Sequence, residues 1–162
     1  MGLNWTADEI LAMAERIENN GAGFYRRAAE IVRDPEVRAR LLELAVWEDG
    51  HERLFARVRA GLTEAERTPE TYDPDGDAAS YLKVMADLHV FRQVEARELL
   101  HGDETASEIL GMALRFERDS ILFFDGLLPF VPDAGRASVR ELIDEERRHV
   151  AFLARERARH GS

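Results

Sequence analysis

The sequence of 162 residues contains no cysteine. This absence excludes disulfide bonds, thiolate zinc sites, iron–sulfur clusters and catalysis by a thiol. Any metal ion that the chain binds must therefore be held by oxygen atoms and by imidazole nitrogens.

Long hydrophobic runs are also missing, and no stretch approaches the roughly 20 apolar residues that a membrane-spanning helix needs. The first five residues have no basic segment followed by an apolar one, so we expect no signal peptide and a cytoplasmic location. Basic residues are in deficit, with 22 Lys and Arg against 32 Asp and Glu and a formal net charge of −10. This charge argues against nucleic acid and against an anionic membrane as partners.

Alternating runs rich in Val and Ile, which would support a sheet, are absent as well. Hydrophobic residues make up 45% of the chain and charged residues 33%, a composition typical of a soluble, helix-rich protein. The length suits one domain. We therefore predict a single all-α domain over residues 1–162.

Two Glu-x-x-His motifs, Glu48 to His51 and Glu146 to His149, lie 98 residues apart. Each has a partner acid upstream, Glu18 and Glu117, and these are 99 residues apart. The surrounding sequence repeats too, most clearly between residues 6–14 and 105–113. Such a repeat indicates a duplicated supersecondary unit. We predict one helical hairpin over about 6–61 and a second over about 105–159.

Helix start and stop signals bracket each half of these hairpins. Thr6 with Glu9 and Thr105 with Glu108 form capping boxes, and Asp34 before a proline is an N-cap signal. The predicted helices cover about 7–33, 35–60, 106–128 and 134–159, with Asp133 as the N-cap of the last.

The remaining stretch, 62–104, belongs to neither repeat and is predicted to be a crossover. An additional short helix is expected to start at Asp77, with Tyr81, Met85 and Leu88 on one face. A long crossover lets both hairpins point the same way in a four-helix bundle.

The four acids occupy positions where apolar residues would be expected. Glu18 and Glu117 fall in heptad stripes of apolar residues, and each Glu-x-x-His pair lies on an apolar stripe at 3-4 spacing. A buried carboxylate without a counter-charge costs several kcal/mol. Two divalent cations would neutralise four carboxylates, and two imidazoles would complete their coordination. Gly21 and Ser120, one turn after the lone acids, are expected to leave space for the metals.

Other candidates have a more ordinary interpretation. Tyr25 is within reach of Glu18, but we interpret it as a core residue. The tryptophans are interpreted as packing residues, the remaining histidines as surface or neighbouring groups, and the acidic pairs 64/66 and 73/75 as a solvated loop without a calcium pattern. We expect these charged neighbours of the motifs to face water: Asp49, Glu52, Glu145 and Arg147.

The motif Glu18-x-x-Gly21-x-x-Phe24-Tyr25 followed by Glu48-x-x-His51, with its repeated copy, resembles the rubrerythrin-like branch of the ferritin-like superfamily over about residues 6–158. The resemblance implies a ferritin-like four-helix bundle with two iron ions. It also implies that Glu48 and Glu146 bridge the two ions. The full ligand set that it implies is Glu18, Glu48, His51, Glu117, Glu146 and His149.

Two features depart from that family. Rubrerythrins proper append a cysteine-ligated rubredoxin domain, which a chain without cysteine lacks. They also carry an additional Glu one turn beyond the third-helix ligand, where this chain has Ser120.

Three functions follow as hypotheses. The first is a non-haem di-iron oxidoreductase that reacts with hydrogen peroxide or dioxygen and receives electrons from an external donor. The second is a ferroxidase or iron-storage protein with the same ligands. The third is a non-redox structural bundle that holds zinc or no metal. Iron is the expected metal, with manganese and zinc as alternatives, and a homodimer or larger homo-oligomer is the expected assembly.

Overall fold

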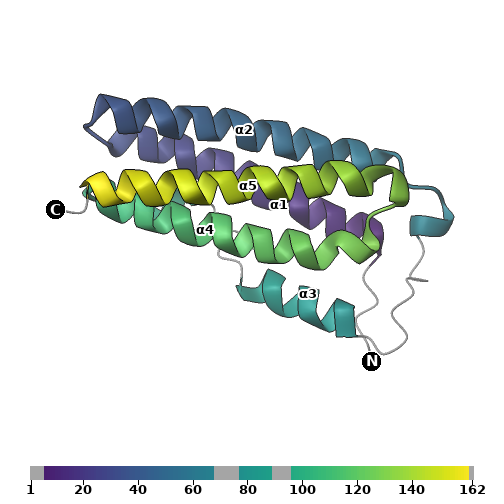
Figure 1. The fold of residues 1–162 in the computed structure, drawn as a ribbon. Helices are drawn as coiled ribbons and strands as arrows, with labels where there is room; N and C mark the ends of the chain where they lie inside the picture. Colours follow the sequence, from purple (N-terminus) through teal and green to yellow (C-terminus); the bar gives the residue numbers. More distant parts are fainter. Residues whose placement is uncertain (1–5, 68–76, 89–95, 161–162) are drawn as a thin grey trace.

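The computed structural model describes residues 6–67, 77–88 and 96–160, and the described part is helical without a strand. Four long helices form the bundle: α1 (Ala7–Ile31), α2 (Pro35–Ala60), α4 (Ala106–Leu127) and α5 (Asp133–His160). A shorter helix, α3 (Asp77–Leu88), lies beside α4 (Figure 1). Within the described residues, no helix has both the length and the apolar character needed to span a bilayer.

The predicted helix starts rest on hydrogen bonds to the backbone. The Glu9 N–H donates to Thr6 Oγ1 over 3.2 Å, and the Glu108 N–H donates to Thr105 Oγ1 over 3.2 Å, so both capping boxes are confirmed. Asp34 caps α2 by accepting from the N–H groups of Glu36 and Val37.

Asp133 does not cap α5, which corrects one prediction. The carbonyl of Pro132 already accepts a hydrogen bond from the Arg136 N–H at 3.1 Å, so Asp133 is the first helical residue. Its carboxylate instead pairs with Arg136 at 2.7 Å.

The helices are arranged as two antiparallel hairpins. α1 packs along α2, and α4 packs along α5, with further contacts from α2 to α5 and from α1 to α4 (Figure 1). The chain between α2 and α4 is the long crossover, and it contains α3. The predicted all-α bundle of two hairpins with an additional short helix is confirmed.

α3 meets α4 through a slightly different face from the predicted one. Leu82 is fully buried, whereas Tyr81 is 42% exposed, and the side chain of Leu88 lies outside the described residues. The Tyr81 ring lies close to Gly126, where an added Cβ would be 2.7 Å from Tyr81 Cε1. The missing side chain of Gly126 thus lets the two helices approach closely.

Phenylalanine rings fill the core on either side of the central acids. Phe55 of α2 meets Phe124 of α4 with ring centroids 4.9 Å apart, and Phe24 of α1 meets Phe116 of α4 at 4.7 Å. These rings exclude water from the centre of the bundle, so any polar group there depends on partners within the protein.

Candidate metal centre

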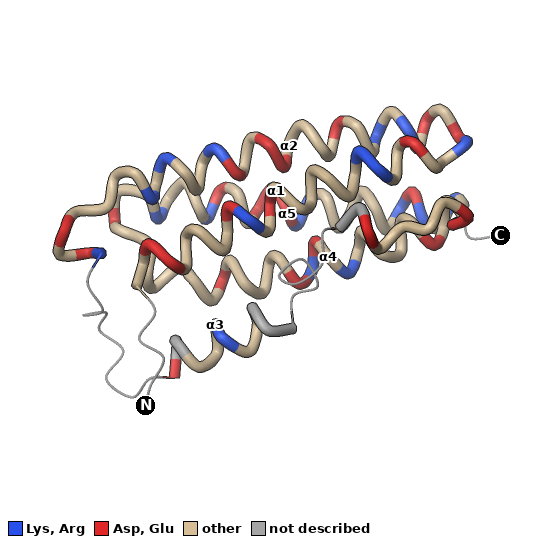
Figure 2. Tube along the Cα trace, turned by 180° about the vertical axis from the view of Figure 1, so that it is seen from behind, with Lys and Arg blue, Asp and Glu red and all other residues tan. Residues whose placement is uncertain are grey.

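All six residues predicted from the two motifs come together in the middle of the bundle. They project from four different helices, and each is buried: Glu18 from α1, Glu48 and His51 from α2, Glu117 from α4, and Glu146 and His149 from α5. Acidic and basic residues are interspersed along all four of these helices (Figure 2). Burial, and not a block of acidic charge, therefore distinguishes the six.

The six residues form two overlapping groups. Glu18 and His51 form one group with Glu48 and Glu146, and Glu117 and His149 form the other with the same two glutamates. One ligand atom from each residue of a group lies within 4.8 Å of the others. Glu48 and Glu146 belong to both groups, which is the arrangement expected of carboxylates that bridge two ions.

Several polar atoms at this centre have no hydrogen-bond partner. Among the described residues, six buried side-chain atoms lack one, and all but Arg136 Nε belong to the site: Glu18 Oε1 and Oε2, Glu48 Oε1, His51 Nδ1 and Glu146 Oε1. His51 Nδ1 and Glu146 Oε1 are 2.5 Å apart but lack the alignment of a hydrogen bond. Buried polar atoms without partners are rare in proteins and need an explanation. A pair of cations between these atoms would supply it.

Burial dominates the acidity of three of the glutamates. It raises the pKa of Glu18 and raises the pKa values of Glu48 and Glu117 well above their ordinary range, with further contributions from the neighbouring carboxylates. Without metal, protons therefore occupy part of the cluster.

His51 and Glu146 form a charged pair. Burial works against both ionised forms, but contacts with Glu146 and Glu18 outweigh it and raise the pKa of His51 to about 11. Contacts with Glu117, His149 and His51 likewise outweigh burial at Glu146 and lower its pKa. The metal-free centre is thus held together in part by the His51 imidazolium and by shared protons.

Three contacts at the edge of the centre were not expected from the sequence. The Tyr25 hydroxyl donates to Glu117 Oε1, so Tyr25 is more than a core residue. Glu145 is half-buried with its Oε2 3.0 Å from His51 Nε2, which corrects the prediction that it faces water. Trp47 is 49% exposed, and its ring meets the His149 ring edge-on with centroids 5.5 Å apart. These contacts join helices that are distant in sequence, so no local pattern reveals them.

Other neighbours of the motifs pair across the α1–α2 hairpin. Asp49 accepts from Arg26, and Glu52 accepts from Asn19 Nδ2 at 3.4 Å. Both carboxylates remain partly exposed, so they face water in part, as predicted, and also pair with α1. Arg147 is exposed, as predicted. The predictions for Trp5, His89 and residues 73 and 75 lie outside the described residues.

Gly21 has a steric role beside the centre. An added Cβ there would lie 2.6 Å from Glu48 Oε2, so only glycine leaves room for this carboxylate. The expectation that Gly21 keeps space at the site is confirmed, with the space taken by Glu48. Ser120, the corresponding residue of α4, is buried.

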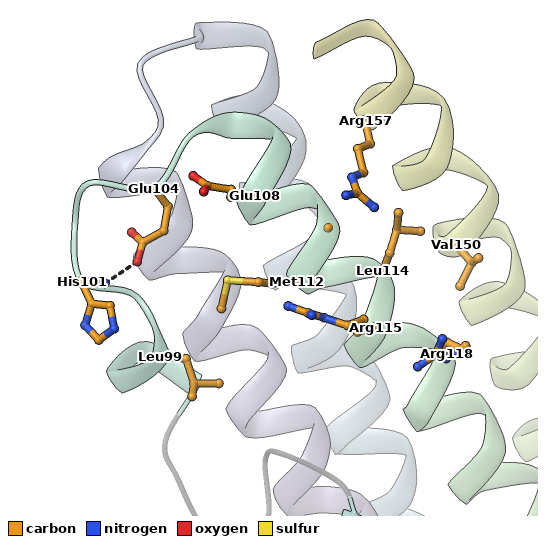
Figure 3. Close-up of a pocket in the computed structure, with 11 residues that line it drawn as sticks. Leu99, His101, Glu104, Glu108, Met112, Leu114, Arg115, Arg118, Val150 and Arg157 are labelled. Atoms are coloured by element: carbon orange, nitrogen blue, oxygen red, sulfur yellow. Dashed lines mark hydrogen bonds between the residues drawn. The ribbon is translucent and has the colours of Figure 1, made fainter. Parts of the chain in front are cut away.

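Hollows indent the surface around the bundle, and they differ in whether they reach the cluster. One hollow, about 680 Å³, lies along α4 and the end of α5, where Arg115, Arg118 and Arg157 line it together with Glu104 and Glu108 (Figure 3). None of the six central residues lines this hollow. A second hollow, about 290 Å³, lies between α2 and α5 and reaches His149 past Trp47 and Phe152.

Comparisons with known proteins agree with this geometry. The sequence model of the rubrerythrin family matches residues 9–157. A solved structure from Thermotoga maritima, described as a ferritin-like diiron-carboxylate protein, superposes with a TM-score of 0.70 and 24% identity over 98% of this chain and 97% of that chain. This similarity shows that the fold is ferritin-like. No curated protein sequence matches the chain.

Proposed function

Because this chain belongs to the rubrerythrin family, we propose that its central cluster binds two iron ions and acts as a non-haem di-iron oxidoreductase. The oxidant in this proposal is hydrogen peroxide or dioxygen. The observation that carries the proposal is the set of unpaired polar atoms in the middle of the bundle, where four carboxylates and two imidazoles converge.

The donor set favours iron. Its mixture of carboxylate oxygen and imidazole nitrogen suits Fe(II) and Mn(II), and the chain has no thiolate to favour copper or zinc. Two Fe(II) ions, when bound, would supply two electrons. With two protons, these electrons reduce one hydrogen peroxide to two molecules of water.

The protein's own groups would hold and shield the pair. Glu18 and His51 would bind one ion, Glu117 and His149 the other, with Glu48 and Glu146 shared between them. The Tyr25 hydroxyl, which burial keeps protonated by raising its pKa well above the ordinary value, would hold Glu117 in place. The phenylalanines around the cluster would exclude bulk water and larger reagents.

Turnover needs a reductant from outside the described residues. These residues contain no second cluster with metal-ligand spacing, and the chain has no cysteine with which to build an iron–sulfur relay. We therefore propose an external electron donor and a product that is water, with iron retained in the protein.

Anaerobic loading with Fe(II), followed by a measured addition of peroxide, tests the proposal. We expect consumption of one peroxide per two iron ions. In the variants Glu48→Ala and Glu146→Ala, iron binding and peroxide consumption should both be lost, because each removes a ligand shared by the two ions.

A suitable control is Glu141→Ala, an exposed glutamate of α5 outside the cluster. It should leave both properties unchanged, and circular dichroism would show that all variants are folded. Unchanged peroxide consumption in both ligand variants would contradict the proposal. Iron that is oxidised without peroxide reduction and then deposited would instead indicate iron storage.

A further inference from the structure

The residue before the glutamate of each Glu-x-x-His motif contacts the histidine of the other motif. Glu145 precedes Glu146 and lies against His51, whereas Trp47 precedes Glu48 and lies against His149. The repeat therefore places two chemically different residues at equivalent positions. One histidine is next to a carboxylate and the other is next to an indole.

Glu145 is expected to strengthen His51 as a ligand. Glu145 Oε2 lies 3.0 Å from His51 Nε2 and can only accept, so Nε2 carries a hydrogen; Nδ1, which faces Glu18 and Glu146, would offer its lone pair once a metal ion is bound. A carboxylate on the outer nitrogen fixes the ring and raises its basicity, and loss of such a partner typically weakens metal binding about 10- to 100-fold.

His149 lacks this support. Its Nδ1 faces Glu146 and Glu117 at 3.2 and 3.7 Å, so Nε2 points away from the cluster. No described residue accepts a hydrogen bond from that Nε2. The Trp47 ring lies beside the His149 ring and nearly perpendicular to it, and both residues line the hollow of about 290 Å³ between α2 and α5.

A second difference between the repeats acts in the same direction. Tyr25 donates a hydrogen bond to Glu117, whereas the equivalent position in the other repeat is Phe124, which has no hydroxyl to offer Glu18. Neither carboxylate oxygen of Glu18 has a hydrogen-bond partner. A donated hydrogen bond withdraws charge from Glu117, so it is the weaker of the two terminal carboxylates.

We propose that the two metal positions are unequal: the position of Glu18 and His51 binds tightly, and the position of Glu117 and His149 binds weakly and exchanges with solvent through the Trp47 hollow. This inference rests on the proposed di-metal function and adds which ion is labile. It assigns Glu145 and Trp47 as positioning residues that act through the two histidines.

Calorimetric titration of the metal-free protein with Mn(II), which does not oxidise readily, tests the inequality without any turnover. We expect two resolved binding steps. Glu145→Ala should weaken the first step about 10- to 100-fold. Trp47→Glu, which places a carboxylate beside His149, should strengthen the second step, and so should Tyr25→Phe. Glu141→Ala, the same change one turn earlier on α5, should alter neither.

Fluorescence supplies an independent signal. The chain has two tryptophans, so in a Trp5→Phe background Trp47 is the only indole, and excitation at the long-wavelength edge of its absorption selects it over the tyrosines. Titration with Co(II), which quenches indole at short range, should produce most of the quenching in the second step, because Trp47 lies against His149.

These experiments distinguish a failure of the proposed inequality from a failure of the di-metal proposal itself. Two equal steps, or variants that change both steps alike, would overturn the inequality and leave the di-metal proposal standing. No binding of either ion would overturn both. A purely structural role for Glu145 predicts a lower melting temperature with an unchanged ratio of the two affinities, and that result would also contradict the inference.

Discussion

Glu18 shows at the scale of one residue why this core favours a bound cation. The side chain is 1% exposed, and neither of its carboxylate oxygens has a hydrogen bond. Burial raises its pKa, so this carboxyl holds a proton to higher pH than an ordinary glutamate does. Protons and metal ions therefore compete for the same oxygens.

This competition predicts how the stability of the metal-free protein depends on pH. The pKa values of Glu18, Glu48 and Glu117 are raised in the folded state, so the folded protein holds protons that the unfolded chain releases above its ordinary glutamate pKa. The pKa of His51, raised from 6.5 to about 11, has the same consequence, because its contribution is complete below 6.5 and is lost as the pH rises toward 11. The free energy of unfolding should therefore fall between pH 6 and pH 9.

Urea unfolding of protein treated with a chelator would measure this slope. Glu146, with a lowered pKa, is ionised throughout that range and leaves the slope unchanged. Glu48→Gln should flatten the slope because it removes one carboxyl group whose pKa is raised. A metal-free protein that becomes more stable from pH 6 to pH 9 would contradict the raised pKa values of these buried groups.

Gly21 gives a second prediction at this scale, in which metal affinity is reduced while the metal-free fold is kept. Alanine is favoured over glycine within a helix by roughly 0.5–1 kcal/mol, but at position 21 its Cβ would lie 2.6 Å from Glu48 Oε2. Gly21→Ala should therefore reduce metal affinity while the metal-free fold persists. Gly23→Ala is the matched control, because an added Cβ there meets nothing within 4 Å. Calorimetric titration of both variants would decide, and equal affinities would refute the steric role.

At the scale of elements, the local signals were sufficient to place the four long helices. Thr6, Asp34 and Thr105 are side-chain caps that act within three residues, so the sequence alone predicts where α1, α2 and α4 begin. The sequence alone also predicts the six central residues, because their spacing places them on apolar helix faces. The contacts of Tyr25, Glu145 and Trp47 depend on how helices pack, which short spacing does not determine.

α3 illustrates the same limit. Its periodicity predicts an amphipathic helix with Tyr81 on the apolar face. In the structure, Leu82 is fully buried, and Tyr81 lies beside Gly126 of α4 and is partly exposed. Leu82→Ala should therefore lower the free energy of unfolding by about 2–5 kcal/mol. Val84→Ala, at a position that is 50% exposed, should change it by less than about 0.5 kcal/mol. Equal effects in urea unfolding would show that α3 does not dock on α4 as described.

At the scale of the whole molecule, duplication explains both the symmetry and the asymmetry of the centre. Two hairpins of similar sequence each supply one lone glutamate and one Glu-x-x-His pair, and their packing encloses one shared cluster. Charged residues of both signs lie along the long helices (Figure 2), whereas the central acids are buried and need cations as partners. The expected homo-oligomer, external electron donor and cytoplasmic location stay predictions.

The number of metal ions per chain tests the central claim most directly. Metal-free protein would be loaded anaerobically with excess Fe(II), passed through a desalting column and measured for iron and protein. The account predicts two iron ions per chain, and none in the double variant Glu48→Ala/Glu146→Ala. Iron-free protein after loading, or the same iron content in the double variant, would contradict it.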